Sequence, residues 1–400
     1  MKIAIISGHW QGGGAESVAR GLFEHLNNHD IDCYYLYMCG KKIDKNKVIK
    51  CGYEWEHYLH AANARLFDCD GYFSTLSTFK LINTLKSLGP DVVNIHNIVC
   101  YSINYELLFS YLKQSNTKVV WTLHDCWSFT GHCIAIDEYR CQKWKTHCHK
   151  CPAKNSYPQS ILLDNSYHNY EKKKKCFQNI RNMLVITPSE WMKGCVEQSF
   201  LHDYKVNVVH NGINLEVFKP VESNIIKNNG LDTQKKTLLC VASRWTKFKG
   251  LKYFTDLANE MKTDDYNFVV IGNITQDKNE QSTNIKYINR TNNIEELVQW
   301  YSAADVLVNP TLADNFPTVN LEALACGTPV VTFNTGGSWE SVGSVCGALA
   351  NQYSVGSLKE AILEILKRNV SISECRSRAM QFSSDKKFDE YLEIFRLYLG

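Results

Sequence analysis

Short runs rich in β-branched residues alternate with helical stretches along this chain, and the alternation restarts near residue 237. This pattern predicts βαβ units, whose successive strands lie parallel in one sheet. The first series comprises IAIIS (3–7), CYYLYM (33–38), DVVNIH (91–96), KVVWTLH (118–124), MLVIT (183–187) and KVNVVH (205–210). The second comprises TLLCVAS (237–243), NFVVIG (267–272), IKYIN (285–289), DVLVNP (305–310) and TPVVTF (328–333). We therefore expect an α/β chain with two Rossmann-like, doubly wound parallel-sheet domains.

The length of the chain agrees with two domains, because 400 residues exceed what a single core usually fills. The segment HNGINLEVFKP (210–220) carries a turn-forming Asn-Gly and ends in Pro. We place the first domain at 1–210 and the second at 211–385. A last helix over 386–400 has an apolar face that needs a partner surface, formed by Phe388, Leu392, Phe395 and Leu399.

Composition and charge narrow the classes of function. The chain has 44% hydrophobic residues, 21% charged residues and a net charge of +3, which give no general reason to expect binding to nucleic acid. The N-terminal apolar run is too short for a signal peptide, and no run approaches the roughly 18 apolar residues of a membrane span. We expect a cytoplasmic protein.

The segment ADNFPTVNLEALACGTPVV (313–331) follows a predicted strand and places Asp314 eight positions before Glu322. A helix beginning at Thr318, its expected N-cap, would direct its first N–H groups at a phosphate. One turn further in, Glu322 could accept hydrogen bonds from a ribose, while Asp314 faces the sugar. The alternative is a solvated loop acid and a helix-surface acid favoured by the dipole.

A glycine-rich loop follows the first strand, in IAIISGHWQGGGAES (3–17). Gly12, Gly13 and Gly14 have no Cβ, so the backbone can approach a ligand closely; a purely structural turn is the alternative. The loop is not G-x-G-x-x-G, and the second strand ends without the acid that a nicotinamide dinucleotide needs. These two features argue against a dehydrogenase.

Two further loops carry candidate catalytic groups. SRWTKFKG (243–250) places Arg244 and Lys249 after a strand, where two cations would neutralise a departing diphosphate, unless the loop is merely a solvated basic one. His124 and Asp125 end another strand, and the pair could orient an imidazole toward a substrate. His96 ends the neighbouring run and is a candidate for the same edge. The alternative is that each histidine is simply a packed or surface residue without a functional role.

Taken together, these segments resemble the GT-B glycosyltransferases, specifically the retaining glycosyltransferase family 4 of cell-surface polysaccharide and lipopolysaccharide synthesis. The resemblance covers nearly the whole chain and depends on the order of several segments. They are GGGAE, PSEWMKGCVEQSF, VVHNGINLEVFKP, SRWTKFKG and the acid-x7-acid element before ALACGTPVV. The family pattern is E-x7-E; here Asp314 takes the first place and Glu322 the second.

The resemblance implies that the second domain holds a nucleotide-diphosphate sugar across a cleft between the domains. It assigns Arg244 and Lys249 to the diphosphate, Asp314 to the sugar and Glu322 to the ribose. Gly13 and Gly14 would close over the phosphates from the first domain, and His124 would contact the transferred sugar or order the acceptor. The donor-binding set is completed by Phe316, Pro317 and Thr318, between the two acids.

The resemblance also implies the course of the reaction. A hexose-type sugar would pass to a glycan or lipid-linked acceptor with its anomeric configuration retained and without a covalent intermediate. The two cations would take the place of a divalent metal, so we expect no cofactor in catalysis. The terminal helix would cross back to the first domain. Two alternatives remain open, a nucleotide-sugar epimerase of the same fold and, in a different class, a zinc-module nucleic-acid-binding protein.

Five of the sixteen cysteines fall within an insert over 126–151. Four of them have the spacing C-x7-C-x6-C-x2-C, which is typical of a structural zinc site: Cys133, Cys141, Cys148 and Cys151. Two disulfides or reduced core cysteines are the alternatives. The insert follows His124, so we expect it on the acceptor side. A nearby run of four lysines, 172–175, could contact anionic lipid at the inner face of the membrane, although such a run is usually solvated.

Overall fold

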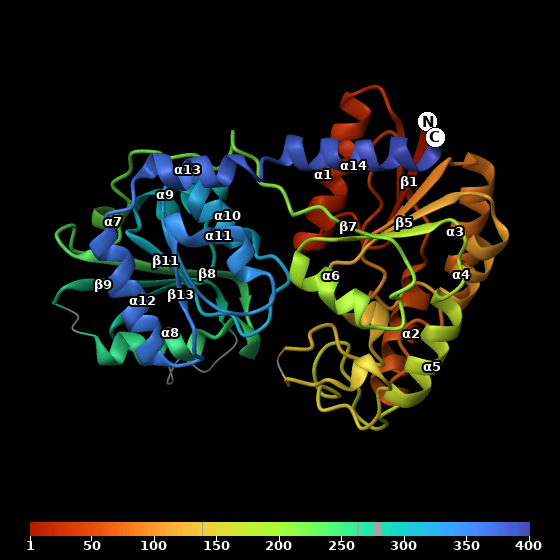
Figure 1. The fold of residues 1–400 in the computed structure, drawn as a ribbon, viewed down its shortest axis with the longest axis horizontal. Helices are drawn as coiled ribbons and strands as arrows, with labels where there is room; N and C mark the ends of the chain where they lie inside the picture. The colour runs from red at the N-terminus through yellow and green to blue at the C-terminus, as the bar shows by residue number, and fades with distance from the viewer. Residues whose placement is uncertain (138, 262–263, 275–281) are drawn as a thin grey trace. The chain divides into compact units, whose positions relative to one another are not determined.

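The computed structural model describes residues 1–137, 139–261, 264–274 and 282–400 and separates into two compact units. The first unit contains residues 1–210 and 387–400, and the second contains residues 211–386. The chain passes from one unit to the other twice, once after His210 and once after Lys386. Each unit is built on one parallel sheet with helices on both faces (Figure 1).

The sheet of the first unit has the strand order β3-β2-β1-β4-β5-β6-β7, and every neighbouring pair is parallel. The six predicted strands are all present, together with a three-residue strand, β3, at one edge. The strand bounds are β1 Lys2–His9, β2 Asp32–Cys39, β3 Val48–Lys50, β4 Val92–Ile95, β5 Lys118–Thr122, β6 Met183–Thr187 and β7 Val206–Val208.

Helices cover both faces of this sheet. Alternate residues of β1 enter opposite cores: Ala4 and Ile6 pack on one face, and Ile3 and Ile5 pack on the other. The helices of the unit are α1 Gly14–Asn28, α2 Glu54–Phe67, α3 Thr75–Leu88, α4 Tyr105–Gln114, α5 Ser166–Phe177, α6 Glu190–Glu197 and α14 Ser384–Leu399. Two short 3₁₀ helices, η1 Trp127–Phe129 and η2 Lys143–Lys145, lie in the cysteine-rich insert.

The terminal helix α14 packs beside α1 on one face of the first sheet (Figure 1). Its buried residues Phe388, Tyr391, Leu392 and Phe395 join the core of β1 and α1. The approach is close, because a Cβ on Gly21 of α1 would lie 2.6 Å from the Phe388 ring. Leu399 is 37% exposed, so the predicted apolar face ends one turn earlier than expected.

The second sheet has the order β10-β9-β8-β11-β12-β13 and is parallel throughout. Counted along this unit the order is 3-2-1-4-5-6, which defines the doubly wound Rossmann arrangement. The five predicted strands are joined by β13. The bounds are β8 Lys236–Trp245, β9 Tyr266–Ile274, β10 Ile285–Ile288, β11 Val306–Asn309, β12 Val330–Phe333 and β13 Gly347–Ala350.

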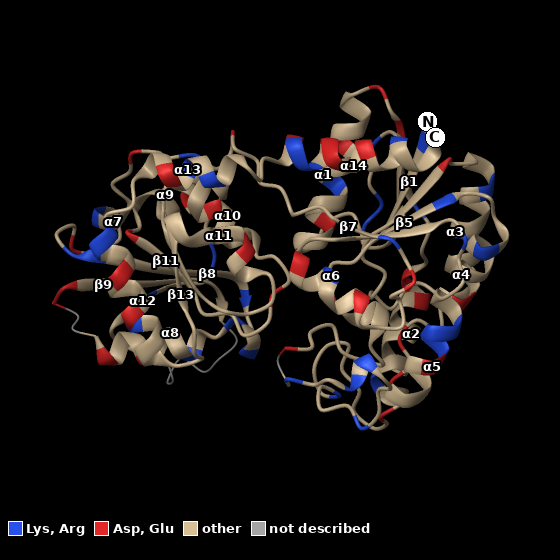
Figure 2. Ribbon diagram, in the orientation of Figure 1, with Lys and Arg blue, Asp and Glu red and all other residues tan. Residues whose placement is uncertain are grey.

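Two apolar cores lie on the two faces of the second sheet, with Leu239 of β8 in one and Leu238 and Cys240 in the other. The helices are α7 Ile225–Asn228, η3 Lys247–Lys249, α8 Leu251–Glu260, α9 Ile294–Ala303, α10 Thr318–Ala325, α11 Ser338–Cys346, α12 Val355–Arg368 and α13 Ile372–Met380. Figure 2 shows both signs of charge on the helices of each unit, in keeping with the net charge of +3. No helix among the described residues is long and apolar enough to cross a membrane.

Candidate functional site

The carboxyl ends of β8 and β11 bring two predicted residues into contact. Lys249, in η3 after β8, places its Nζ 2.6 Å from Oδ2 of Asp314, in the loop after β11. The two loops are also joined through backbone, since the Leu312 N–H donates to the Phe248 carbonyl at 2.6 Å. Neighbouring strands in a parallel sheet end at the same edge, where ligands of this fold class bind.

Gly250 allows the β8 loop to turn this closely. Its φ is +68°, in the left-handed region, and a Cβ there would lie 1.9 Å from the Pro310 carbonyl oxygen. Only glycine meets both conditions without strain. Arg244 lies within β8 and not in the loop as predicted, because β8 continues past a bulge to Trp245. Its side chain is exposed at the same end of the strand.

Helix α10 begins at this edge, but its cap differs from the prediction. Pro317 occupies the N-cap position, with the extended backbone usual there (φ −70°, ψ 120°), and Thr318 is the first helical residue. Phe316, predicted to bind the donor, is buried in the core against Phe382, with ring centroids 5.5 Å apart. Its side chain therefore anchors the loop in the core and does not face the sheet edge. The N-terminus of α10 still presents the N–H groups and the dipole that favour an anion.

Glu322 lies one turn into α10 and is held in place. The Tyr301 hydroxyl donates to its Oε2 at 2.8 Å, and Thr318 is a second side-chain hydrogen-bond partner. Burial raises the pKa of Glu322, against the opposing effect of these two hydrogen bonds. Its carboxylate is thus positioned and partly desolvated, so a hydroxyl donor that reaches it is bound more strongly than in water.

In the glycine-rich loop of the first unit, Gly13 and Gly14 differ from Gly12 in what surrounds them. Gly13 is the N-cap of α1 and Gly14 its first residue; both are exposed, and a Cβ on Gly14 would meet no atom within 4 Å. Gly12 has a structural reason instead, because a Cβ there would lie 2.8 Å from a Glu16 carboxylate oxygen. The other Glu16 oxygen accepts the Asn97 side-chain N–H at 2.7 Å. At Gly13 and Gly14 the backbone is therefore open to a ligand.

His124 and His96 form a hydrogen-bonded pair at the ends of β5 and β4. His124 Nε2 and His96 Nδ1 are 2.9 Å apart, and His96 Nε2 lies 2.7 Å from Asn94 Oδ1. The Asn94 amide N–H is used by Val120 and Thr122, so its oxygen accepts and His96 Nε2 carries the proton. In the neutral pair His124 Nε2–H therefore donates to His96 Nδ1.

The partner that orients His124 is thus His96 and not the predicted Asp125. The Asp125 carboxylate accepts the Trp127 N–H at 2.8 Å at the start of η1. Burial lowers the pKa of His124 to about 4, and burial lowers the pKa of His96 well below its usual value. Both rings are neutral at physiological pH, which suits hydrogen bonding to a hydroxyl better than electrostatic contact with a phosphate.

Two polar clusters of the first unit were not foreseen. In one, Cys39 Sγ lies 3.3 Å from His57 Nδ1 and also hydrogen-bonds with Cys100, which lowers the pKa of Cys39. The Cys39 contact raises the pKa of His57. Cys39 is separated from His57 by 18 residues and from Cys100 by 61, so no short motif signals the cluster.

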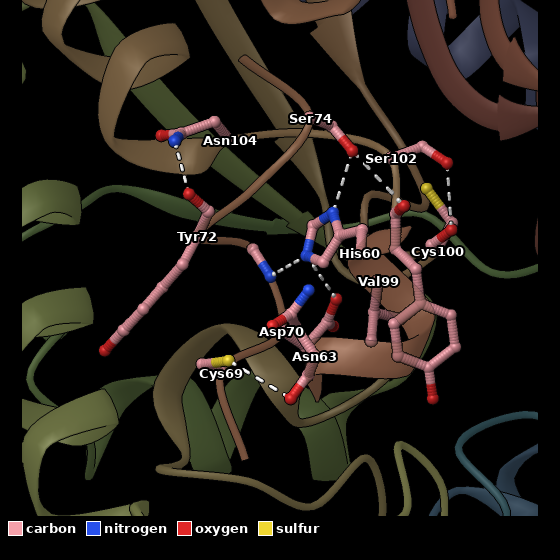
Figure 3. Close-up of polar contacts among 12 residues, drawn as sticks. His60, Asn63, Cys69, Asp70, Tyr72, Ser74, Val99, Cys100, Ser102 and Asn104 are labelled. Carbon is pink, nitrogen blue, oxygen red and sulfur yellow. Dashed lines mark hydrogen bonds and ion pairs between the residues drawn. The ribbon is translucent and has the colours of Figure 1, made fainter. Parts of the chain in front are cut away.

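The second cluster surrounds His60 and is drawn in Figure 3. The Gly71 N–H donates to His60 Nε2 at 2.8 Å, so the proton is on Nδ1, 2.9 Å from Ser74 Oγ. Burial lowers the pKa of His60 to about 3, and the ring is neutral although Asp70 Oδ1 lies 3.5 Å away. Burial raises the pKa of Asp70 to about 7. The cluster supports the segment that leads into α3.

The cysteine-rich insert and the lysine run complete the predicted sites. All four proposed zinc ligands are free thiols that line one small cavity.

The run of lysines over 172–175 is partly engaged within the protein. Lys173 is buried and donates to the Trp127 and Thr130 carbonyls, and Lys172 pairs with Glu106 at 2.8 Å. Two of the four lysines are therefore engaged within the protein, which weakens the predicted lipid contact at this run.

The fold is that of the GT-B glycosyltransferases, and solved structures share it. Sucrose-phosphate synthase from Thermosynechococcus elongatus aligns over 99% of this chain and 98% of its own, with a TM-score of 0.72 and 17% identity. Anabaena Alr3699/HepE in complex with UDP-glucose aligns over 98% and 99%, with a TM-score of 0.65 and 16% identity.

Family models identify the chain further. Residues 12–217 match the model described as Glycosyltransferase Family 4, and residues 235–368 match the model described as Glycosyl transferases group 1. The chain therefore belongs to glycosyltransferase family 4. It is also similar to the putative colanic acid biosynthesis glycosyl transferase WcaC of Escherichia coli (strain K12), with 25% identity over 96% of each chain.

Proposed function

We propose that the protein is a retaining glycosyltransferase that moves a hexose-type sugar from a nucleoside-diphosphate sugar to a glycan or lipid-linked acceptor in surface-polysaccharide synthesis. The observation that carries this proposal is the Lys249–Asp314 contact beside the N-terminus of α10. It combines a cation for a diphosphate, an acid for a sugar and a helix terminus for a phosphate at one sheet edge. The UDP-glucose complex of a protein with this fold supports the choice of donor.

The second unit supplies the groups that a diphosphate leaving group needs. Lys249 is about one-third exposed and lies next to the exposed Arg244 strand end, so both cations can reach bound ligand. Fixed positive charge stabilises the growing charge on the leaving phosphate, which is the role that a divalent ion has in other transferases. Glu322 would hold the ribose hydroxyls. Catalysis is thus assigned to the side chains without a metal.

The proposal includes retention of configuration, which the family resemblance implies. The acceptor oxygen would bond to the anomeric carbon on the face from which the diphosphate leaves, and a phosphate oxygen would take the acceptor's proton. Asp314 is held by Lys249, which favours orienting the sugar over attacking it. In the first unit, neutral His124 is assigned to a hydroxyl of the sugar or acceptor, and the Gly13–Gly14 backbone to the donor phosphates.

A lipid-linked acceptor requires contact with a membrane, and one surface of the first unit suits it. We define the α2–α3 surface as the exposed apolar residues of these helices, of the segment between them and of the adjoining loop: Trp55, Tyr58, Leu59, Leu66, Phe67, Phe73, Leu76, Phe79, Ile161, Leu162 and Leu163. The loop runs along the end of α2, since the Ile161 N–H donates to the Arg65 carbonyl at 2.6 Å.

The composition of the α2–α3 surface favours a membrane over a protein partner. Trp55, Tyr58 and Leu59 are between 54% and 69% exposed, and exposed Arg65 and half-buried Lys80 lie among them. Aromatic residues with flanking cations are typical of the interface between water and anionic lipid. We therefore assign this surface to peripheral contact at the cytoplasmic face, in place of the lysine run.

The activity is tested by incubating the purified chain with a panel of nucleoside-diphosphate hexoses and following binding by thermal shift. The best donor is then used with glycan and undecaprenyl-type acceptors. The expected product is a glycoside whose anomeric proton coupling in NMR matches that of the donor. An inverted anomer, or a free epimer of the donor sugar, would overturn the retaining transferase.

Membrane contact is tested separately by cosedimentation with vesicles of phosphatidylethanolamine and phosphatidylglycerol. The triple variant Trp55→Ser, Leu59→Ser and Phe79→Ser is expected to lose most of its binding. Val345→Ser, an exposed apolar residue of α11, is the matched control and should bind as the parent does. Equal binding by both variants would remove the α2–α3 surface from the proposal and leave the transferase assignment intact.

A further inference from the structure

The cysteine-rich insert is long and has little regular structure. Between η1 and α5, the 3₁₀ helix η2 is the one element of helix or strand among the described residues. Yet this segment, residues 130–165, buries several side chains, among them Trp144, Ala153 and Ser160. Connections of this length usually lack a single conformation, and loop-rich modules that have one are commonly held by a metal or by disulfides. A metal or a disulfide would hold such an insert in one conformation, in addition to the packing of Trp144 and Cys148 in the core.

The four thiols of the C-x7-C-x6-C-x2-C pattern line the same cavity. Its volume is about 20 Å³, and its wall is completed by residues such as His132, Trp144 and Pro152. A space of this size accepts one water-sized object. A single ion therefore fits the enclosed space. The thiols concerned are Cys133, Cys141, Cys148 and Cys151.

Backbone N–H groups point at two of these sulfurs. The Gly131 amide hydrogen-bonds to Cys148, and the Ala153 amide hydrogen-bonds to Cys151, two residues before it. Amide N–H groups that donate to sulfur stabilise metal thiolates and orient them, in the manner of the outer shell of a metal site. Gly131 also has to be glycine, because a Cβ there would lie 2.1 Å from the Ser166 carbonyl oxygen and 2.8 Å from the Cys148 Cβ.

The charge around the cavity matches a metal–thiolate centre. Four thiolates around one Zn²⁺ carry a net charge of about −2. The surrounding loops are basic, with Lys143 in the cavity wall (Figure 2). Five Lys and Arg residues occur within fifteen positions: Arg140, Lys143, Lys145, Lys150 and Lys154. Such a surplus of positive charge offsets the charge of the centre.

We propose that Cys133, Cys141, Cys148 and Cys151 bind one structural Zn²⁺ that holds the insert in its conformation. Around zinc, the sulfurs would be about 3.8 Å apart. Among the described residues, His25, His29 and Asp389 are the group whose potential ligand atoms all lie within 4.8 Å of one another. The Cys133 and Cys151 thiols hydrogen-bond with each other. No three of the four sulfurs, all of them on described residues, lie within 4.8 Å of one another, so the remaining thiols would move inward on binding.

The His25 group is the competing site. Two of its members are exposed, and its His25–Asp389 contact of 2.9 Å already links α1 to α14. An exposed pair of this kind gives weak and poorly selective binding, whereas four thiols around one cavity give a closed tetrahedral site. Zinc at the insert is therefore favoured, and the experiment includes the competing group.

The test is elemental analysis of the full chain purified without chelator. About one zinc per chain is expected. The double variant Cys148→Ser and Cys151→Ser should lose at least four-fifths of it, whereas Cys176→Ser, a half-buried cysteine of α5 outside the insert, should retain it. The variant His25→Ala and His29→Ala should also retain it. Cobalt in place of zinc should show the visible bands of a tetrahedral thiolate complex.

A second measurement does not require the double variant to fold. The unmutated protein is alkylated under native conditions, with and without a strong zinc chelator, and the modified cysteines are mapped by mass spectrometry. The four thiols should be protected until the chelator is added. The proposal is wrong if all four react without chelator, if they form disulfides in unreduced protein, or if the zinc is lost from the His25 variant alone. None of these results bears on the transferase activity.

Discussion

Lys249 Nζ and Asp314 Oδ2 are 2.6 Å apart, although 65 residues separate them in the chain. The contact joins the loops after β8 and β11 and places one fixed positive and one fixed negative group at the edge where α10 begins. In a complex with a diphosphate sugar, the Lys249 ammonium would contact the phosphates and the Asp314 carboxylate would contact the sugar.

Lys249→Met is expected to lower kcat about 100- to 1000-fold, because it removes a cation from the leaving diphosphate. Lys252→Met is the matched control: this lysine begins the next helix turn and pairs with Asp256 on an exposed surface. Steady-state kinetics with the best donor would compare the two. Unchanged turnover in Lys249→Met would remove the residue from catalysis.

Glu322→Gln is expected to raise the KM for the donor about tenfold or more, the effect of losing a hydrogen bond to a charged group. Because burial raises the pKa of Glu322, donor affinity should also begin to fall at a higher pH than for an ordinary glutamate. Isothermal titration with the nucleoside diphosphate between pH 5 and 8 would measure the affinity of each protein and its dependence on pH, and steady-state kinetics would give the KM. Glu360→Gln, exposed on α12, is the control and should leave the affinity unchanged.

The His96–His124 pair should make folding sensitive to acid. Burial lowers the pKa of both rings, so between about pH 6.5 and 4 the unfolded chain binds protons that the folded chain does not. The free energy of unfolding should therefore fall as pH falls, by up to about 1.4 kcal/mol per pH unit for each ring. Urea denaturation of His96→Gln at pH 7 and pH 5 should show a shallower dependence. An equal slope in both proteins would contradict the assignment.

Asp70 should act in the opposite direction. Burial raises the pKa of its carboxyl to about 7, so between about pH 4 and 7 the folded chain holds a proton that the unfolded chain releases. This part of the stability is lost as pH rises through that range. Asp70→Asn should thus gain stability over the parent at pH 8 and match it at pH 4, by urea denaturation. Asp203→Asn, an exposed acid, serves as control. A less stable Asp70→Asn at pH 8 would show that the attraction of Lys173 outweighs burial.

Gly250→Ala is expected to destabilise the second unit by more than about 2 kcal/mol, since left-handed backbone costs an alanine about 1–2 kcal/mol and its Cβ would also collide with Pro310. Gly356→Ala, at an open position in α12, should instead stabilise by about 0.4–1 kcal/mol. Guanidinium denaturation would measure the pair. Similar values for the two variants would contradict the steric argument.

Eleven strands could be predicted because each carries a run of β-branched or aromatic residues long enough to show in sequence. The two that were missed lack that signal: β3 has three residues, and β13 reads Gly-Ala-Leu-Ala, which has little strand preference of its own. Both form at a sheet edge because a neighbouring strand offers hydrogen bonds to them. The end of β8 was misplaced for a related reason, since a bulge and pairing with β9 extend it to include Arg244.

The sequence by itself determined the two parallel sheets, the loops that carry the candidate groups and the family, because periodicity and short motifs are local properties of the chain. Only the tertiary structure decided which side chains meet. Lys249 contacts Asp314, His96 takes the place expected for Asp125, and Phe316 turns into the core. The physical reason is that side-chain contacts depend on which strands are neighbours and on how each loop packs, and these depend on residues far apart in the chain.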